Sequence, residues 1–244
     1  MRTINLTKHE VEKKDFVKRP ALRKDFKTLI TESCILKHDG KVIGVYLVLP
    51  KTSTRLLKAI KRIDIGGRNK RSGGIRSESR VFGNSPRDTM RKDYCSSAML
   101  AHDFHYEHEM ICSYGAELAK HYEEHCPEMY NYHNDLAQQK VKPNWLIKDS
   151  PFTSGIINKN SALNYHFDTG NFQDVYSTML AFKKHIGGGY LSLPEFDVGL
   201  VSQCGANTNN PLGTGSVRTA QDMCGNLTTE RIDFEVMSTG PNLQ

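Results

Sequence analysis

The chain has 244 residues, of which 38% are hydrophobic and 25% charged, and its formal net charge is +6. This composition is that of a globular protein and excludes a disordered chain, while no apolar run approaches the roughly 18 residues of a membrane helix. No apolar signal sequence is visible, and six cysteines without a CxxC pair exclude a disulfide scaffold and a structural zinc module. We therefore expect an intracellular protein, nuclear if its source is eukaryotic, with no membrane partner.

A β-hairpin is predicted near the start of the chain. Asp39 and Gly40 lie between the apolar runs 35–37 and 41–49, and Asp-Gly between such runs is a strong hairpin signal. The uninterrupted apolar run from Val42 to Leu49 favours a strand that is buried on both faces.

A strongly basic segment follows, beginning with a short helix predicted over Thr54–Ile63. Twelve Lys/Arg and three Asp/Glu lie between Arg55 and Lys92, whereas nine acids and one Lys lie between Asp93 and Asp135. A charge step of this size favours an anionic partner such as nucleic acid for the first segment. A solvated basic surface without a partner is the alternative.

The longest predicted helix runs from Ser96 to Cys126, because apolar residues recur there at three- and four-residue spacings. Pro127 is expected to end it. From Pro151 onward, Gly, Asn and Ser separate short apolar runs, and strands are predicted over 178–182 and 190–193.

This order of elements predicts an α+β fold. The three expected parts are an N-terminal α/β extension over residues 1–94, a helix followed by a β core over 95–200, and an atypical tail over 201–244.

A candidate metal site lies in the β half, at His166–Phe167–Asp168. Residues i and i+2 of a strand point to the same face, so the imidazole and the carboxylate can converge on one ion. These are two members of the 2-His-1-carboxylate triad that holds ferrous iron in oxygenases. A histidine bonded to a backbone carbonyl and an aspartate in a turn are the structural alternative.

The surrounding sequence resembles the TET/JBP family of Fe(II)/2-oxoglutarate dioxygenases, in the branch found in phages, algae and fungi. The likeness lies in FTSGIIN (Phe152 to Asn158), in H-x-D-x-x-N (His166, Asp168 and Asn171) and in GGYLSLPE (Gly188 to Glu195). Upstream, RVFGNSPRDTMRKDYC (Arg80 to Cys95) is similar to the segment that precedes the catalytic core in the family. Together the matches cover residues 80 to 200, about half of the chain.

The resemblance implies a double-stranded β-helix, or jelly roll, and oxidation of 5-methylpyrimidine bases in nucleic acid, with DNA favoured over RNA. It implies that His166 and Asp168 bind Fe(II) and that Asn171 contacts the flipped-out base. Arg87 and Arg91 become candidates for contacting the cosubstrate 2-oxoglutarate or the DNA backbone, with the two roles unassigned. Extrusion of the base fits the chemistry, because a 5-methyl group within a duplex lies away from any deep pocket.

The sequence departs from the family pattern after Leu200. The family has a distal histidine ligand on a later strand and a basic residue for 2-oxoglutarate beyond it, but no histidine follows His185. The segment from Val201 to Leu227 is rich in Gly, Asn and Thr, and neither Arg218 nor Arg231 follows a histidine. We therefore expect an incomplete core from a truncated or frameshifted gene, and slow turnover or none.

Two other classes of function remain open. His121, Glu124 and His125 match H-x-x-E-H, in which two histidines one helical turn apart bind zinc and the glutamate is the base of a peptidase. The alternative for these residues is the exposed end of an amphipathic helix. The third possibility is a catalytically dead remnant that still binds nucleic acid through its basic segment.

Overall fold

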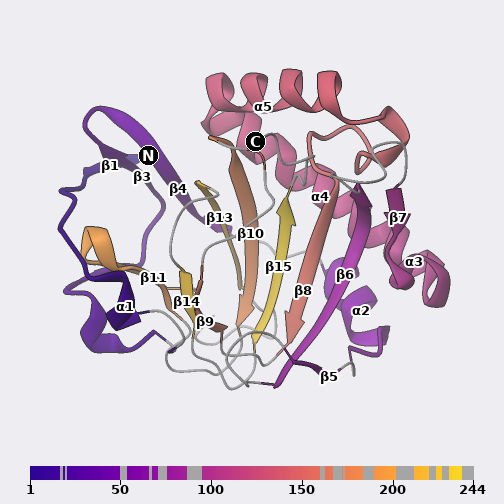
Figure 1. Cartoon of the computed structure of the whole chain (residues 1–244), viewed down its shortest axis with the longest axis horizontal. Coiled ribbons are helices and arrows are strands. Elements are labelled where there is room, and N and C mark those ends of the chain that lie inside the picture. The colour runs from indigo at the N-terminus through magenta and orange to yellow at the C-terminus, as the bar shows by residue number, and fades with distance from the viewer. Residues whose placement is uncertain are drawn as a thin grey trace.

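A computed structural model gives the chain one large sheet, two small sheets and a group of helices (Figure 1). It describes residues 1–16, 19, 21–49, 54–65, 68–70, 76–86, 95–159, 163–166, 172, 174–183, 190–201, 212–219, 224–226 and 231–237. The helices are α1 (Lys13–Phe16), α2 (Thr54–Arg62), α3 (Met99–Asp103), α4 (His105–His125) and α5 (Pro127–Lys140), with 3-10 turns at Arg23–Asp25, Pro143–Trp145 and Pro194–Phe196. None of the described helices is long and apolar enough to cross a membrane.

The large sheet is built from strands of both halves of the chain. Its members are β1 (Arg2–Asn5), β3 (Cys34–His38), β4 (Lys41–Leu49), β13 (Leu212–Thr219), β10 (Tyr176–Lys183), β15 (Arg231–Met237), β8 (Ser154–Lys159), β6 (Arg76–Pro86) and β5 (Arg68–Lys70), in that spatial order, with β7 (Cys95–Ser97) beside β6. All neighbours are antiparallel except β1 and β3.

Five shorter strands make the small sheets. They are β11 (Tyr190–Leu193), β12 (Val198–Val201) and β2 (Thr28–Ile30) in one sheet, and β14 (Cys224–Asn226) and β9 (Leu163–His166) in the other. In sequence, β8, β10, β13 and β15 belong to the large sheet, whereas β9, β11, β12 and β14 belong to the small ones. The second half of the chain therefore passes repeatedly between the two sides.

The hairpin predicted in the first half is confirmed. β3 and β4 pair around Asp39 and Gly40, whose φ angles are 47° and 77°. Both values lie in the left-handed region, as a two-residue hairpin turn requires, and glycine adopts it without a steric cost. The short basic helix predicted next is also confirmed, as α2.

The prediction of one long helix from Ser96 to Cys126 is wrong in its details. It is broken at Phe104 into α3 and α4, because Phe104 has φ −141° and ψ 61°, outside the helical region. Pro127 was expected to end helical structure but is the first residue of α5. Proline suits the first turn of a helix, where its missing N–H leaves no hydrogen bond unmade.

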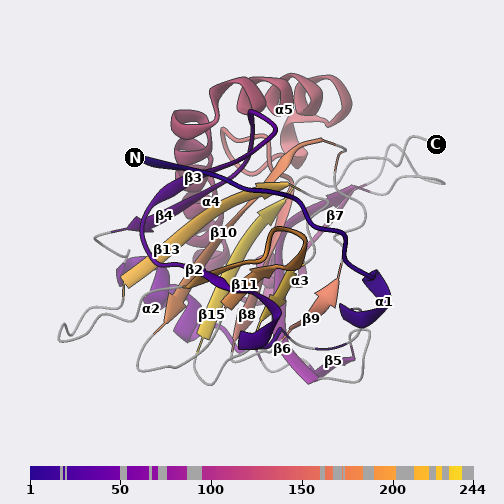
Figure 2. The ribbon, with the colours of Figure 1, turned by 90° about the vertical axis from the view of Figure 1, so that its left-hand side faces the viewer.

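The two faces of the large sheet are covered differently. One face packs against α2, α4 and α5 through an apolar core that includes Val45, Phe82, Ile157 and Leu180. The other face meets the three-stranded sheet at Tyr46 and Met179, and Figure 2 shows β2 and β11 on this side and α4 behind the large sheet. The small sheets thus lie on one side of the large sheet, and α2, α4 and α5 lie on the other.

The segment predicted to be an atypical tail, residues 201–244, supplies two strands of the large sheet. β13 lies between β4 and β10, and β15 lies between β10 and β8. We did not predict either strand. The sequence of β13, LGTGSVRT, has no apolar alternation, and its place in the sheet depends on pairing with strands more than 25 residues away in sequence.

Candidate functional site

The predicted metal residue His166 is the last residue of β9. β9 pairs with β14 in antiparallel register, with Cys224 directly opposite His166. β14 in turn lies against β11 of the three-stranded sheet. The backbone at position 166 therefore belongs to the layer of small strands that covers one face of the large sheet (Figure 2).

The preceding residue, Tyr165, fixes β9 to the N-terminal part of the chain. Its side chain is 2% exposed, and its hydroxyl lies 3.1 Å from Asp25 Oδ2 and 2.9 Å from Ser192 Oγ. The Tyr165 backbone N–H donates to the carbonyl of Arg19 at 3.0 Å, and the Arg19 guanidinium donates two hydrogen bonds to Asp25, at 2.7 and 3.0 Å. Successive strand residues alternate between faces, so position 166 is on the face of β9 turned away from this network.

The interactions between Arg19 and Asp25 keep both of these side chains ionised. Burial opposes ionisation of Asp25, but hydrogen bonds from Arg19 and from the Leu22 N–H outweigh it and lower the pKa of the carboxyl group. The hydrogen bond to Asp25 raises the pKa of Arg19 against the effect of burial, and burial raises the pKa of Tyr165. At neutral pH an ionised pair and a neutral phenol thus hold β9, and charge-assisted bidentate pairs are the stronger kind of hydrogen bond.

A layer of buried polar side chains lies on the face of the large sheet that meets the small sheets. Ser79, Asn158 and Ser177 are each 2–3% exposed. Asn158 Oδ1 and Ser177 Oγ have no hydrogen-bond partner among the described residues. Unpaired buried polar atoms cost free energy, so these two atoms fit a site for a polar ligand or ordered water. Across the ladder, Ser177 lies opposite Arg218 of β13.

The other predicted site residues, Asp168, Asn171, Arg87 and Arg91, lie outside the described residues. Their assignments remain predictions. The imidazole of His166 and the carboxylate of Asp168 are a donor pair that fits Fe(II) by its chemistry.

A contact that sequence reasoning missed anchors the strand leading to Arg87 and Arg91. The Gly83 N–H of β6 donates to Nε2 of the buried His108 at 3.0 Å. Gly83 has φ 78°, and a Cβ there would meet the Thr153 carbonyl oxygen at 2.6 Å. Burial lowers the pKa of His108, which leaves the ring neutral and able to accept this bond. A glycine before a basic segment and a histidine on an apolar helix face were the available signals.

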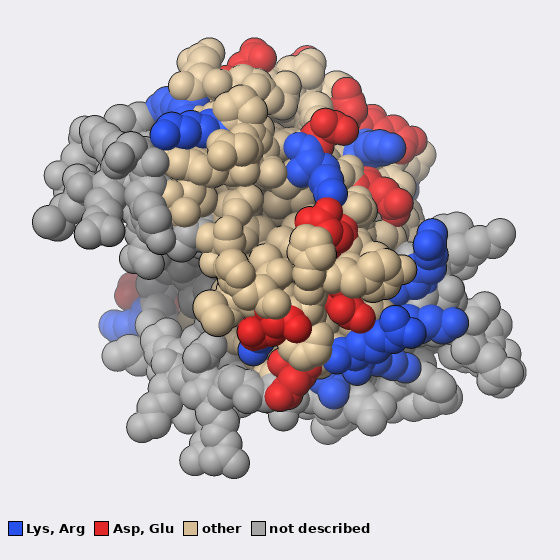
Figure 3. All heavy atoms as spheres, turned by 90° about the vertical axis from the view of Figure 1, so that its right-hand side faces the viewer, with Lys and Arg blue, Asp and Glu red and all other residues tan. Residues whose placement is uncertain are grey.

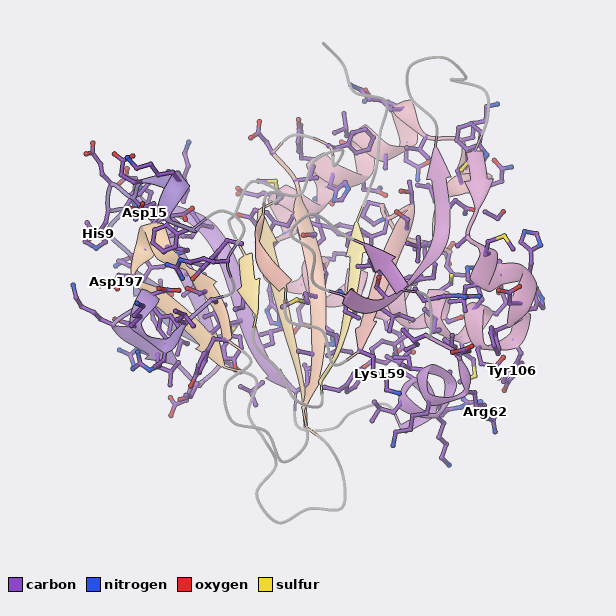
Figure 4. All side chains as sticks on the ribbon, turned by 60° about the horizontal axis from the view of Figure 1, so that its bottom comes forward. His9, Asp15, Arg62, Tyr106, Lys159 and Asp197 are labelled. Atoms are coloured by element: carbon purple, nitrogen blue, oxygen red, sulfur yellow. The ribbon has the colours of Figure 1, made fainter. Side chains whose placement is uncertain are left out.

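The basic helix α2 presents its cations to solvent. Arg55, Lys58, Lys61 and Arg62 are exposed, whereas Leu56, Leu57, Ala59 and Ile60 are buried against the helical side. Arg62 lies 3.8 Å from Glu107 of α4, which is a weak surface pair. Figure 3 shows blue side chains gathered in the lower part of this face, and Figure 4 shows Arg62, Tyr106 and Lys159 on the same side of the molecule.

The residues of the zinc-peptidase alternative are together in the last turn of α4. Glu124 Oε2 lies 3.8 Å from His121 Nδ1 and 3.9 Å from His125 Nε2, and the three candidate ligand atoms lie within 4.8 Å of one another. The Glu124 side chain is 66% exposed. With its oxygen between the two imidazoles, Glu124 occupies the place of a third ligand, whereas a peptidase needs it as a free base.

The comparisons with known proteins bear on the fold. No protein-family model matches the sequence, and no curated protein matches it. Among solved structures, NgTET1 in complex with 5mC DNA is similar in fold, with a TM-score of 0.58 over 87% of this chain and 82% of that chain, at 11% sequence identity. This chain therefore has a mixed α/β fold with a TET protein among its structural neighbours.

Proposed function

We propose that this chain is a TET/JBP-type dioxygenase that uses Fe(II) and 2-oxoglutarate to oxidise 5-methylpyrimidine bases in nucleic acid. The observation that carries the proposal is the order of its last eight strands, β8 to β15, which pass between a large sheet and a layer of small ones. This order suits a jelly-roll core, in which two sheets enclose a site. The fold likeness to NgTET1, solved with 5mC DNA, supports the same assignment.

In this proposal His166 and Asp168 hold the iron at the end of β9. Bound iron and 2-oxoglutarate supply the oxidising chemistry when present, and the protein orients the base and excludes water. The network of Tyr165, Asp25 and Arg19 fixes the backbone that carries His166. The unpaired atoms of Asn158 and Ser177 are candidates for binding the polar cosubstrate between the sheets.

The nucleic acid would be held from outside the core. The exposed cations of α2 fit phosphate groups, and Lys159 lies at the end of β8 on the same side of the molecule (Figure 4). The 5-methyl group of a paired base lies in the major groove, so the base must leave the stack to reach a buried metal. Asn171 is our candidate for hydrogen-bonding the base edge, because an amide both donates and accepts. Arg87 and Arg91 remain candidates for the backbone or the cosubstrate.

The test is turnover by the purified full chain. Protein loaded with Fe(II) and 2-oxoglutarate is mixed with aerobic buffer and a duplex containing either 5-methylcytosine or thymine as its only 5-methyl base. We expect succinate and a 5-hydroxymethyl base, formed slowly, and neither product from His166→Ala. Nucleic-acid binding without any oxidised base would favour the catalytically dead remnant instead. If the protein neither binds the nucleic acid nor forms a product, the proposal is refuted.

A further inference from the structure

We infer that the last turn of α4 binds a divalent transition-metal ion such as zinc through His121, Glu124 and His125, and that the ion stabilises the junction of α4 with α5. The residues differ from those of the proposed iron site, and the inference does not depend on the proposed function. Each of the three side chains offers a donor of a kind that binds zinc, namely an imidazole nitrogen from each histidine and a carboxylate oxygen from the glutamate.

The helix itself brings these donors together. Residues three and four positions apart lie on one face of an α-helix, so His121 shares a face with both Glu124 and His125. Glu124 Oε2 lies 3.8 Å from His121 Nδ1 and 3.9 Å from His125 Nε2, and the ligand atoms of the three residues lie within 4.8 Å of one another. The local fold of α4 therefore gathers three donors at one point.

The distances are close to those of a bound ion. Zinc bonds of about 2.0–2.2 Å to nitrogen and oxygen place two tetrahedral ligands about 3.4 Å apart. The two distances from Glu124 Oε2 exceed this separation by about 0.4–0.5 Å. Glu124 is exposed and both histidines are half-buried, so small side-chain rotations can close the gap. The same exposure lets water occupy the coordination positions that the protein leaves open.

The electrostatics of the position favour a cation. α4 has 21 residues and ends at His125, and the free carbonyl groups of the last turn of a helix carry partial negative charge. The carboxylate of Glu124 forms ion pairs with the histidines only when their rings are protonated, whereas a metal ion binds the carboxylate and two neutral rings together. Imidazole donors favour zinc, cobalt, nickel or copper over magnesium and calcium, which prefer oxygen.

The site lies where α4 gives way to α5 (Figure 1). Cys126 separates the two helices with φ −140° and ψ 57°, and its N–H donates to the Tyr122 carbonyl at 2.9 Å. The Tyr122 hydroxyl donates to the Met129 carbonyl at 3.1 Å, across the same junction. A chelate from His121 to His125 spans the turn just before this break. Binding to the folded chain alone then stabilises the fold by mass action.

The experiment titrates the full chain with zinc by calorimetry, in a His166→Ala background that removes a ligand of the proposed iron site. We expect one zinc ion per chain. His125→Asn and Glu124→Gln should each weaken the affinity at least tenfold, since losing even an outer-shell partner of a metal commonly costs about 10- to 100-fold. The matched control is His105→Asn, at an exposed histidine in the first turn of the same helix, and it should leave the affinity unchanged.

Thermal unfolding separates metal binding from a purely structural role of these side chains. With a chelator present, the three variants should unfold at the temperature of the background protein. Excess zinc should raise the unfolding temperature of the background and of His105→Asn, but not that of His125→Asn. The inference is overturned if no zinc binds, or if His125→Asn binds zinc as tightly as the control does.

Glu124→Gln distinguishes a ligand from a base. Undiminished zinc affinity in this variant overturns the role of Glu124 as a ligand, and an accompanying loss of peptide hydrolysis would make Glu124 the base of a peptidase. Because the background lacks His166, every one of these outcomes leaves the oxygenase proposal to its own test.

Discussion

The two faces of the large sheet differ in what they bury. The face under α4 carries large apolar side chains such as Phe82 and Leu180, both fully buried. The face under the small sheets carries Ser79, Asn158 and Ser177, two of them with unpaired polar atoms among the described residues. Burial of apolar area stabilises a fold, whereas unpaired polar atoms destabilise it unless something binds them. Unpaired buried polar atoms also occur among the described residues of the helical side, at Thr178 Oγ1 and on both ring nitrogens of His133. What distinguishes the face under the small sheets is therefore its row of small polar side chains, which is suited to binding a polar group.

The largest expected effect is on the helical face. Leu180→Ala removes a fully buried side chain from β10 and should lower the free energy of unfolding by about 3 kcal/mol. The matched variant on the same strand is Ser177→Ala, which should leave this free energy unchanged or raise it, because the Ser177 hydroxyl is buried without a partner among the described residues and such burial costs free energy. Urea unfolding measures both. Equal losses in the two variants would remove the distinction between the faces.

A buried histidine on the helical side should make stability depend on pH. His133 of α5 is fully buried against Tyr122 and Phe152, and burial lowers its pKa to about 3. The unfolded chain binds a proton near pH 6.5 and the folded one does not, so stability is complete above that pH and falls as pH decreases toward 3. The loss at pH 5 is about 2 kcal/mol, at roughly 1.4 kcal/mol per pH unit.

Thermal unfolding from about pH 7 to pH 4.5 tests this dependence. His133→Leu should flatten the profile, whereas His105→Asn, at an exposed position of α4, should keep the wild-type slope. An unchanged slope in His133→Leu would show that another group controls the acid sensitivity.

A smaller loss of stability is expected at Tyr165, through which the N-terminal residues Arg19 and Asp25 fix β9. Tyr165→Phe removes the hydroxyl that lies beside Asp25 and Ser192 and should cost about 1 kcal/mol. In a double-mutant cycle with Asp25→Asn, the two losses should not add, because the residues share one network. Additive losses would mean that Tyr165 does not depend on Asp25.

The smallest effect on stability and the clearest on binding is expected at α2. A triple variant with alanine in place of Arg55, Lys58 and Lys61 should change the free energy of unfolding by less than about 0.5 kcal/mol, since all three side chains are exposed. The slope of log affinity for duplex DNA against log salt should become shallower by about three, because each removed cation leaves one phosphate with its counterions. The control variant has alanine at the exposed Lys24 and at Lys8 and Lys14, which adjoin the labelled His9 and Asp15 on the opposite side of the molecule (Figure 4). Equal slopes in both triple variants would exclude α2 as the phosphate-binding surface.

Features set by neighbouring residues were predictable from the sequence. The β3–β4 hairpin depends on Asp39–Gly40, and α2 shows its amphipathic pattern within nine residues. The start of α5 at Pro127 was missed because proline can end one helix and begin the next. β15 does alternate, with Ile232, Phe234 and Val236 separated by Asp233 and Glu235, but its short length beside Gly- and Asn-rich sequence hid that pattern.

Of the candidate site, the sequence supplied the residue types but not the pairing. His166 was found from the H-x-D spacing, which is local. The opposition of Cys224 and His166, and the contact of Gly83 with His108, join residues distant in sequence, so no local pattern predicts them. Long-range pairing is decided by the whole sheet and becomes visible only when every strand is placed.

The central position of β15 affects how the chain can assemble during synthesis. β15 lies between β8 and β10, yet it begins at Arg231, more than 40 residues after the end of β10. Until it leaves the ribosome, β8 and β10 each have an unpaired edge, and such edges favour aggregation. Pairing across long sequence distances is also slow. Nascent chains of this protein can therefore close the large sheet only after β15 has been made.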